Sequence, residues 1–215
     1  MTADSLARLS ISYTDDFPVR GAAISTIGSS FGGETVSATD DVAARLDEIQ
    51  LDLGEGPCWE ASRRRTPVLV VDVRAEADRW PLFSAEAGRL PLASVYAFPL
   101  RIAGLDVGVV DLYNVRAAPL STADIERIRS RSPGTALRVV AQVLTDDAGE
   151  ASANVHSRRL VHQATGMILA RHGITADESL LLLRAHAFAQ GRPVSEVAEE
   201  IVDRRTGFPP PPLEI

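Results

Sequence analysis

Side chains that can bind nucleic acid are concentrated between residues 158 and 192 of the 215-residue chain. An arginine guanidinium can bind phosphate or stack on an unpaired base, and a glutamine amide can hydrogen-bond a base edge. Helical spacing would bring several of them onto neighbouring turns of one face. For each single residue, a polar face that only contacts water is the alternative interpretation. The candidate contacts are Arg158, Arg159, His162, Gln163, Thr165, Arg184 and Arg192.

The histidines of the chain all lie in this same region, as His156, His162, His172 and His186. No two of them have the i, i+4 spacing of a helical zinc site, and no cluster of acidic ligands accompanies them. We therefore expect no metal site here. His186 is more typical of a packing or docking residue.

Residues for catalysis are scattered. Cys58 is the only cysteine, so the chain cannot form an internal disulfide, a cysteine-rich zinc site or a pair of cooperating thiols. Asp72, Asp78, Glu86 and Asp111 form no paired-carboxylate pattern, and no Ser–His–Asp arrangement or phosphate-binding loop is present. We expect no enzyme activity and no cofactor.

The overall charge of -7 argues against general affinity for nucleic acid, although a local basic face is compatible with it. All the basic residues other than histidine are arginines, which bind phosphate and stack on bases better than lysine does. The sequence has no run of about 18 apolar residues, which argues against a membrane span. Its first 16 residues lack the pattern of a secretory signal, so we expect a cytoplasmic protein.

Three short amphipathic helices are predicted in the C-terminal region. The first covers about 152–171, where apolar residues recur every three or four positions. The second covers 176–190, because Thr175 and Glu178 match a capping box and Gly191 is a natural C-cap. The third begins at Pro193. Helices of this length bury only a small core, so we expect this module to dock on another domain or partner.

A recurring set of residues runs through these three helices, namely Arg159, Gln163, Ala164, Gly166, Ile168, Glu178, Leu183, Arg184, Ala187, Arg192, Val197, Ala198, Ile201 and Val202. With this pattern the region resembles the ANTAR family, in which a three-helix module binds RNA. The resemblance implies binding to paired RNA hairpins and control of transcription termination. Thr165 departs from the pattern, because the family often has lysine there, and this removes one cation.

The longer N-terminal part has the pattern of a mixed α/β domain. Strands are predicted at 21–27 and 66–73, and two more, 94–102 and 106–115, are joined by a short Gly104 turn as in a hairpin. A helix at 42–53 should end at Gly54. A helix over 122–145 is interrupted by Pro133 and Gly134, which predicts either a kink or two helices.

Three segments of this part resemble the GAF family of sensory domains, namely LGEGPC at 53–58, AFPLR at 97–101 and VGVVDLY at 107–113. The resemblance implies a small-molecule pocket between the sheet and its helices. The alternative is that its aromatic residues are ordinary core or surface residues. The family's cyclic-nucleotide signature is absent, and no histidine is available to bind haem. The candidate pocket residues are Trp59, Trp80, Phe83, Tyr96, Phe98, Asp111 and Tyr113.

The sequence thus predicts an α+β GAF-like domain with an antiparallel sheet, followed by an all-α three-helix ANTAR domain. We expect a signal-responsive, RNA-binding antitermination regulator that forms a homodimer, with an unknown small molecule at the GAF-like domain. The alternative is a ligand- or partner-binding regulator whose C-terminal helices serve only docking or dimerisation. The expected boundaries are 1–18 for an N-terminal extension, 19–145 for the sensory domain, 146–154 for a linker or helical bridge, 155–207 for the RNA-binding domain and 208–215 for a proline-rich tail.

Overall fold

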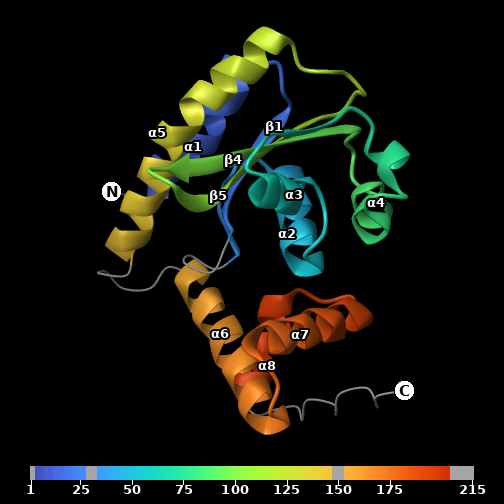
Figure 1. Ribbon diagram of the computed structural model, residues 1–215, viewed down its shortest axis with the longest axis vertical. Coiled ribbons are helices and arrows are strands. Elements are labelled where there is room, and N and C mark those ends of the chain that lie inside the picture. The colour runs from blue at the N-terminus through green and yellow to red at the C-terminus, as the bar shows by residue number, and fades with distance from the viewer. Residues whose placement is uncertain (1–2, 28–32, 147–152, 204–215) are drawn as a thin grey trace. The chain divides into compact units, whose positions relative to one another are not determined.

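The computed structural model describes residues 3–27, 33–146 and 153–203 (Figure 1). Contacts divide the chain into two compact units, residues 1–150 and 151–215, each of which is described by itself. Part of the expected bridge at 146–154, and all of the expected tail at 208–215, lie outside the described residues.

The first unit is built on a five-stranded sheet in its described part, with the order β2-β1-β5-β4-β3. All neighbouring strands are antiparallel, which confirms the predicted α+β class with an antiparallel sheet. Strand β5 lies in the middle and therefore has neighbours on both edges. The strands are β1 (Gly21–Thr26), β2 (Glu34–Ala38), β3 (Val68–Val70), β4 (Ser94–Ile102) and β5 (Leu105–Asn114).

The predicted hairpin is formed by β4 and β5. Ile102 pairs with Leu105, so only Ala103 and Gly104 form the turn. Both have positive φ, 49° and 84°, as the tight turns that suit twisted strands require. Farther along β5, a Cβ at Gly108 would collide with the backbone oxygen of Ser25 on β1, so glycine permits the close approach of the two strands.

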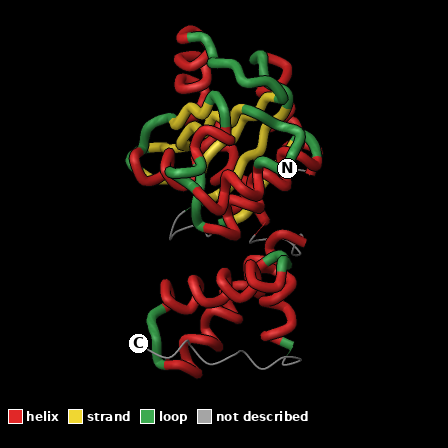
Figure 2. Tube along the Cα trace, turned by 90° about the vertical axis from the view of Figure 1, so that its right-hand side faces the viewer, coloured by secondary structure: helices red, strands yellow, loops and turns green. Residues whose placement is uncertain are grey.

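Helices cover both faces of this sheet (Figures 1 and 2). One face packs against α2 (Asp41–Leu53), α3 (Pro57–Arg64) and α4 (Pro81–Ala87), and the other packs against α1 (Ala3–Asp16) and α5 (Thr122–Asp146). Side chains of a strand alternate between its two faces. Val109 and Tyr113 of β5 therefore join the first core, while Val110 and Leu112 join the second.

Local signals explain the bounds of two of these helices. The Asp40 side chain accepts a hydrogen bond from Ala43 N at the start of α2, and Gly54 ends it with a left-handed φ of 66°. The predicted interruption of α5 does not divide it, since Pro133 lies inside one helix. Pro133 is exposed, and the neighbouring Ser132 hydroxyl donates to Ile128 O at 3.0 Å.

Three elements differ from the expectations. Residues 1–18, expected as an extension, contain α1, whose Leu9 and Tyr13 are buried in the core. The strand expected at 66–73 is limited to Val68–Val70, because the Asp72 side chain accepts from Arg74 N and turns the chain into a 3-10 helix. The end of the expected helix at Gly54 is followed almost at once by α3, which begins at Pro57 and had not been predicted.

The second unit contains three helices among its described residues, α6 (Ala153–His172), α7 (Ala176–Gln190) and α8 (Val194–Val202), as predicted. The capping box is present, with Glu178 N donating to Thr175 Oγ1 and Thr175 N donating to the Glu178 carboxylate. Gly191 ends α7 with a φ of 64°, and Pro193 is the N-cap of α8. The buried core comprises Leu160, Ala164, Ile168, Leu183, Ala187, Val194, Val197, Ala198 and Ile201.

Candidate functional site

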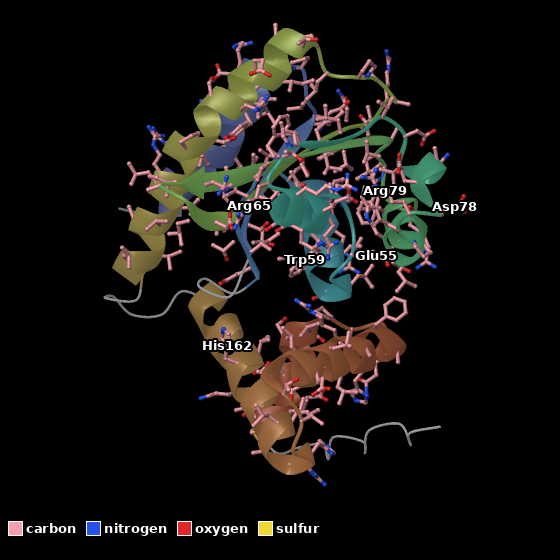
Figure 3. All side chains as sticks on the ribbon, viewed as in Figure 1. Glu55, Trp59, Arg65, Asp78, Arg79 and His162 are labelled. Atoms are coloured by element: carbon pink, nitrogen blue, oxygen red, sulfur yellow. The ribbon has the colours of Figure 1, made fainter. Side chains whose placement is uncertain are left out.

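The outward face of α6 is the first candidate site. Leu160, Ala164 and Ile168 bury one face of this helix in the core of the second unit. His162 and Gln163 lie outside this buried face and are exposed; Figure 3 shows His162 on α6. The structure thus places two of the predicted RNA contacts where a ligand can reach them.

The other predicted RNA contacts on α6 are either half-buried or have side chains that the structure does not describe. Thr165 is half-buried, and its hydroxyl donates to Val161 O of the same helix at 2.7 Å. Its oxygen can still accept a hydrogen bond, but its proton is already used. Arg158 and Arg159 lie on α6 in a stretch whose side chains are outside the described part of the structure.

The two predicted arginines beyond α6 are half-buried and engaged with the protein. Arg192 forms ion pairs with Glu200 at 2.7 Å and with Glu196 at 3.4 Å, and its hydrogen bond to Glu200 raises its pKa. Arg184 on α7 also has a partner. The structure therefore leaves His162 and Gln163 exposed at consecutive positions of α6, whereas Arg192 connects the start of α8 to carboxylates farther along it.

The same helix exposes uncharged residues that the sequence analysis had not proposed as RNA contacts. Gly166 lies between His162 and Ala170 in helical order, and a Cβ there would have nothing within 4 Å. Met167 and Leu169 are 37% and 38% exposed. A glycine inside an otherwise regular helix was the signal available in the sequence, since it costs helical stability without a packing reason.

Helix α7 also exposes large apolar side chains. Leu181 is 65% exposed and Phe188 is 48% exposed, although Leu183 and Ala187 of the same helix are buried. The sequence could have shown this, because Leu181 and Phe188 are seven residues apart and outside the buried stripe.

The second candidate site lies in the first unit, where α2 packs on the sheet. Gln50 of α2 donates from Nε2 to Asp111 Oδ2 of β5 at 2.7 Å, and its Oε1 accepts from Cys58 N at 2.8 Å. One turn earlier on α2, Asp47 Oδ2 accepts from Thr35 Oγ1 of β2 at 2.6 Å. Asp47, Gln50, Cys58 and Asp111 are all buried. Of these four, only Asp111 had been proposed from the sequence.

Burial disfavours the charged form of each acidic group in this cluster. It raises the pKa of Asp47 to about 6 and, together with the charge of Asp47, raises the pKa of Asp111 well above its usual value. Burial and the charges of Asp111 and Asp47 also raise the pKa of the Cys58 thiol well above its usual value. Cys58 is therefore not an activated nucleophile.

The aromatic residues of the predicted pocket lie on two different faces of the sheet. Trp80, Phe83 and Tyr113 are buried in the core under α2, α3 and α4, on the same side as Asp111. Trp59 of α3 packs against that core and donates from Nε1 to Gln50 O at 2.6 Å (Figure 3).

Tyr96 and Phe98 of β4 lie instead in the core formed with α1 and α5. The single proton of the Tyr96 hydroxyl is within hydrogen-bond reach of two acceptors, Ser94 Oγ at 2.8 Å and Ala118 O. The period of two along a strand explains this, because Ala97 lies between them and faces the other side. The seven predicted pocket residues therefore do not form one site, and five of them share the face that carries Asp111.

The part of the chain that the structure describes brings no three His, Cys, Asp or Glu side chains into an arrangement that could hold a metal ion. Among its described helices, none is long and apolar enough to cross a membrane.

Comparison with protein families finds two matches. The GAF domain model matches residues 1–137, more than half of the chain, and the ANTAR domain model matches residues 150–202. The first match includes α1, which had been expected as an extension. A search of the curated proteins finds no match.

Solved structures resemble the first unit at low sequence identity. A domain of a two-component sensor histidine kinase protein from Sinorhizobium meliloti has a TM-score of 0.54 at 11% identity, covering 69% of this chain and 96% of that one. The GAF domain of a phosphoenolpyruvate-protein phosphotransferase from Coxiella burnetii has 0.51 at 14% identity, covering 68% and 86%. These likenesses show the GAF fold.

A further structure, a free methionine-R-sulfoxide reductase from Thermoplasma acidophilum, has a TM-score of 0.48 at 17% identity, covering 65% of this chain and 92% of that one. Reduction of methionine sulfoxide is the activity of that protein. A GAF domain implies a sensor, and an ANTAR domain implies an RNA-binding antitermination regulator. The chain therefore belongs to the GAF family, and it combines this sensor domain with a C-terminal ANTAR domain.

Proposed function

We propose that this protein binds paired RNA hairpins through the exposed face of α6 and that a signal at its GAF domain controls this binding. The observation that carries the proposal is the exposure of His162 and Gln163 on α6, within the residues that match the ANTAR domain. Imidazole and amide groups can hydrogen-bond or stack on the unpaired bases of RNA loops. We also propose that the protein acts in the cytoplasm, as expected of a bacterial-type antitermination regulator with an ANTAR domain.

The experiment is a titration of the full chain against a synthetic two-hairpin RNA and against a control with scrambled loops, at moderate salt. Replacing both His162 and Gln163 with alanine should weaken loop-dependent binding by about tenfold or more, since a base contact contributes roughly 1–3 kcal/mol. Ser195→Ala on α8 is the matched control and should leave the affinity unchanged. Equal affinities of the wild type and a folded double variant would contradict the proposed contacts.

We also propose a homodimer formed through α5. Leu137 and Leu144 on this helix are 57% and 63% exposed. They belong to a series with alternating spacings of four and three, which is the a/d pattern of a coiled coil. The series, exposed throughout, is Ser130, Gly134, Leu137, Ala141 and Leu144. Two ANTAR domains in one dimer would bind two linked hairpins with greater avidity than one domain could.

The exposed apolar residues of α7 favour a second candidate function. Leu181 and Phe188 give this helix a surface that suits a protein partner. In that case the C-terminal helices serve docking, and the GAF domain regulates a protein contact instead of an RNA contact. Absence of loop-dependent RNA binding by the full chain, together with loss of a partner complex in Phe188→Ala, would favour this function.

A further inference from the structure

Phe188 is an aromatic side chain that the second unit leaves exposed. Among the exposed large apolar side chains of the described residues it is the only aromatic one, with 48% of its surface exposed. The preceding residue, Ala187, is buried in the core of the three helices, which Phe188 does not join. The packing of the three helices thus leaves this ring available to a partner.

The side chains beside Phe188 on α7 leave its ring accessible. Residues three, four and seven positions earlier lie on the same face of a helix, and here they are Ala185, Arg184 and Leu181. Ala185 and the following Ala189 are exposed and carry only a methyl group. Apart from Arg184, the nearest neighbours of the ring along this helix are therefore small, so a flat group can approach it.

The charge of this segment suits an anionic partner. Residues 179–195 contain Arg184 and Arg192 and no aspartate or glutamate, although the whole chain has 29 acidic residues and a charge of -7. Arg192 is paired with carboxylates of α8, which leaves Arg184, one turn before Phe188, as the cation on the same face of α7. Arg184 has a partner within the protein, but a guanidinium carries five N–H donors and can bind a phosphate in addition.

The end of α7 is also arranged so that it repels an anion less than a bare helix end would. The last carbonyl groups of a helix carry a negative partial charge. Here Gly191 N donates to Phe188 O and Arg192 N donates to Ala187 O, each at 3.0 Å. The two carbonyl groups beside the ring therefore already have donors.

We propose that Phe188 stacks on an unpaired loop base of the RNA and that Arg184 binds an adjacent phosphate. This adds a second contact, on α7, to those proposed for His162 and Gln163 on α6, so the inference rests on the proposed RNA-binding function. Stacking tolerates any base, because every base has a π-face, so the ring contributes affinity for an unpaired loop whatever its sequence. A protein partner would instead use Phe188 and Leu181 together as an apolar surface.

Phe188→Leu separates stacking from apolar contact, because leucine keeps a large apolar side chain and has no aromatic ring. It should weaken binding of the full chain to the two-hairpin RNA by roughly tenfold, as expected for the loss of one base–aromatic stack. Phe188→Tyr keeps the ring and should retain the affinity of the wild type. Leu181→Ala, exposed on the same face of α7, is the matched control and should leave the RNA affinity unchanged.

Abasic nucleotides identify the base that the ring contacts. Each loop base of the RNA is removed in turn, and the affinities of the wild type and of Phe188→Leu are compared. Removal of the stacked base should weaken binding of the wild type by roughly tenfold and leave that of Phe188→Leu unchanged, because both changes remove the same contact. Circular dichroism would verify that the variants fold.

The inference is overturned if a folded Phe188→Leu variant binds the RNA as tightly as the wild type, which would leave the ring to a protein partner. It is also overturned if Phe188→Tyr loses as much affinity as Phe188→Leu, or if every abasic position weakens both proteins equally. RNA binding that depends on His162 and Gln163 but not on Phe188 would refute this inference alone. Absence of loop-dependent binding by the wild type would refute the proposed function, and this inference with it.

Discussion

Gln50 Nε2 lies 2.7 Å from Asp111 Oδ2, which joins α2 to the middle strand of the sheet by a buried hydrogen bond between residues 61 positions apart. The other end of the same amide accepts from Cys58 N at the start of α3. One side chain therefore fixes the relative positions of two helices and a strand. We expect the geometry of this contact to determine how the domain responds to pH and ligands.

Stability should decrease as the pH rises, because burial raises the pKa of Asp47 from 3.8 to about 6 in the folded protein. A carboxyl whose pKa is raised in the folded state stabilises the fold most at pH values below its unfolded-state pKa. This stabilisation is lost as the pH rises through its folded-state pKa. Between about pH 4 and pH 6 the loss is on the order of 3 kcal/mol, and Asp111 continues it at higher pH.

Urea unfolding at a series of pH values would measure the free energy of unfolding of the first unit. Asp47→Asn should flatten the profile relative to the wild type. Asp106→Asn is the control, because Asp106 has a lowered pKa near Arg101 and Arg65 and should leave the decrease in place. Parallel profiles for the wild type and Asp47→Asn would contradict the expectation.

Gly108→Ala should strongly destabilise the first unit, because the new Cβ would collide with the backbone oxygen of Ser25. Strands β1 and β5 would have to separate, and we expect a loss of about 3 kcal/mol or more. Gly134→Ala is the contrasting variant, since a Cβ there meets nothing within 4 Å and α5 should gain up to about 1 kcal/mol. Denaturant unfolding, followed by circular dichroism, measures the free energy of unfolding of both variants. Similar changes in the two would contradict the close approach of β1 and β5 at Gly108.

Thr175→Ala should loosen the start of α7, since it removes the hydroxyl that accepts from Glu178 N. Loss of such an N-cap costs about 1 kcal/mol. Hydrogen exchange at the first amides of α7 should therefore be roughly fivefold faster, and Thr175→Ser should restore the slow rate. Unchanged exchange in the alanine variant would show that core packing alone holds this end of the helix.

Leu137→Glu combined with Leu144→Glu should convert the proposed homodimer to monomer, because both side chains are exposed on one face of α5. Sedimentation equilibrium of the full chain gives the molecular mass directly. Leu82→Glu makes the same change at an exposed leucine of α4, away from α5, and should leave the dimer intact. A monomeric wild type would refute the α5 interface.

Local signals in the sequence were sufficient to predict several elements. The capping box at Thr175 and the turn at Gly104 were found because each depends only on residues close in the chain. The packing of α1 was missed because Tyr13 contacts Thr135, 122 residues away, through its hydroxyl at 2.8 Å. The start of the chain carried no comparable local signal of burial.

The candidate site residues also differ in whether local or long-range contacts determine their placement. Exposure of His162 follows from the apolar period of α6, which the sequence displays. The placement of Tyr96 and Phe98 depends on which face of β4 meets α5, and that choice required the whole sheet. Asp47 was not proposed from the sequence, because a helical aspartate is usually exposed, and its burial and its hydrogen bond from Thr35 of β2 depend on the folded sheet.

Strand β5 has a consequence for signal transmission. Its Asp111 accepts a hydrogen bond from Gln50 on the side of the sheet that α2 covers, and the next residue, Leu112, packs in the core that contains α5. Because a close-packed interior transmits strain, a displacement of Asp111 by a ligand would also act on the packing of Leu112 against α5. In the chain, α5 is the last described element before the ANTAR domain. Strand β5 would therefore couple ligand binding at the GAF domain to the RNA affinity of the ANTAR domain.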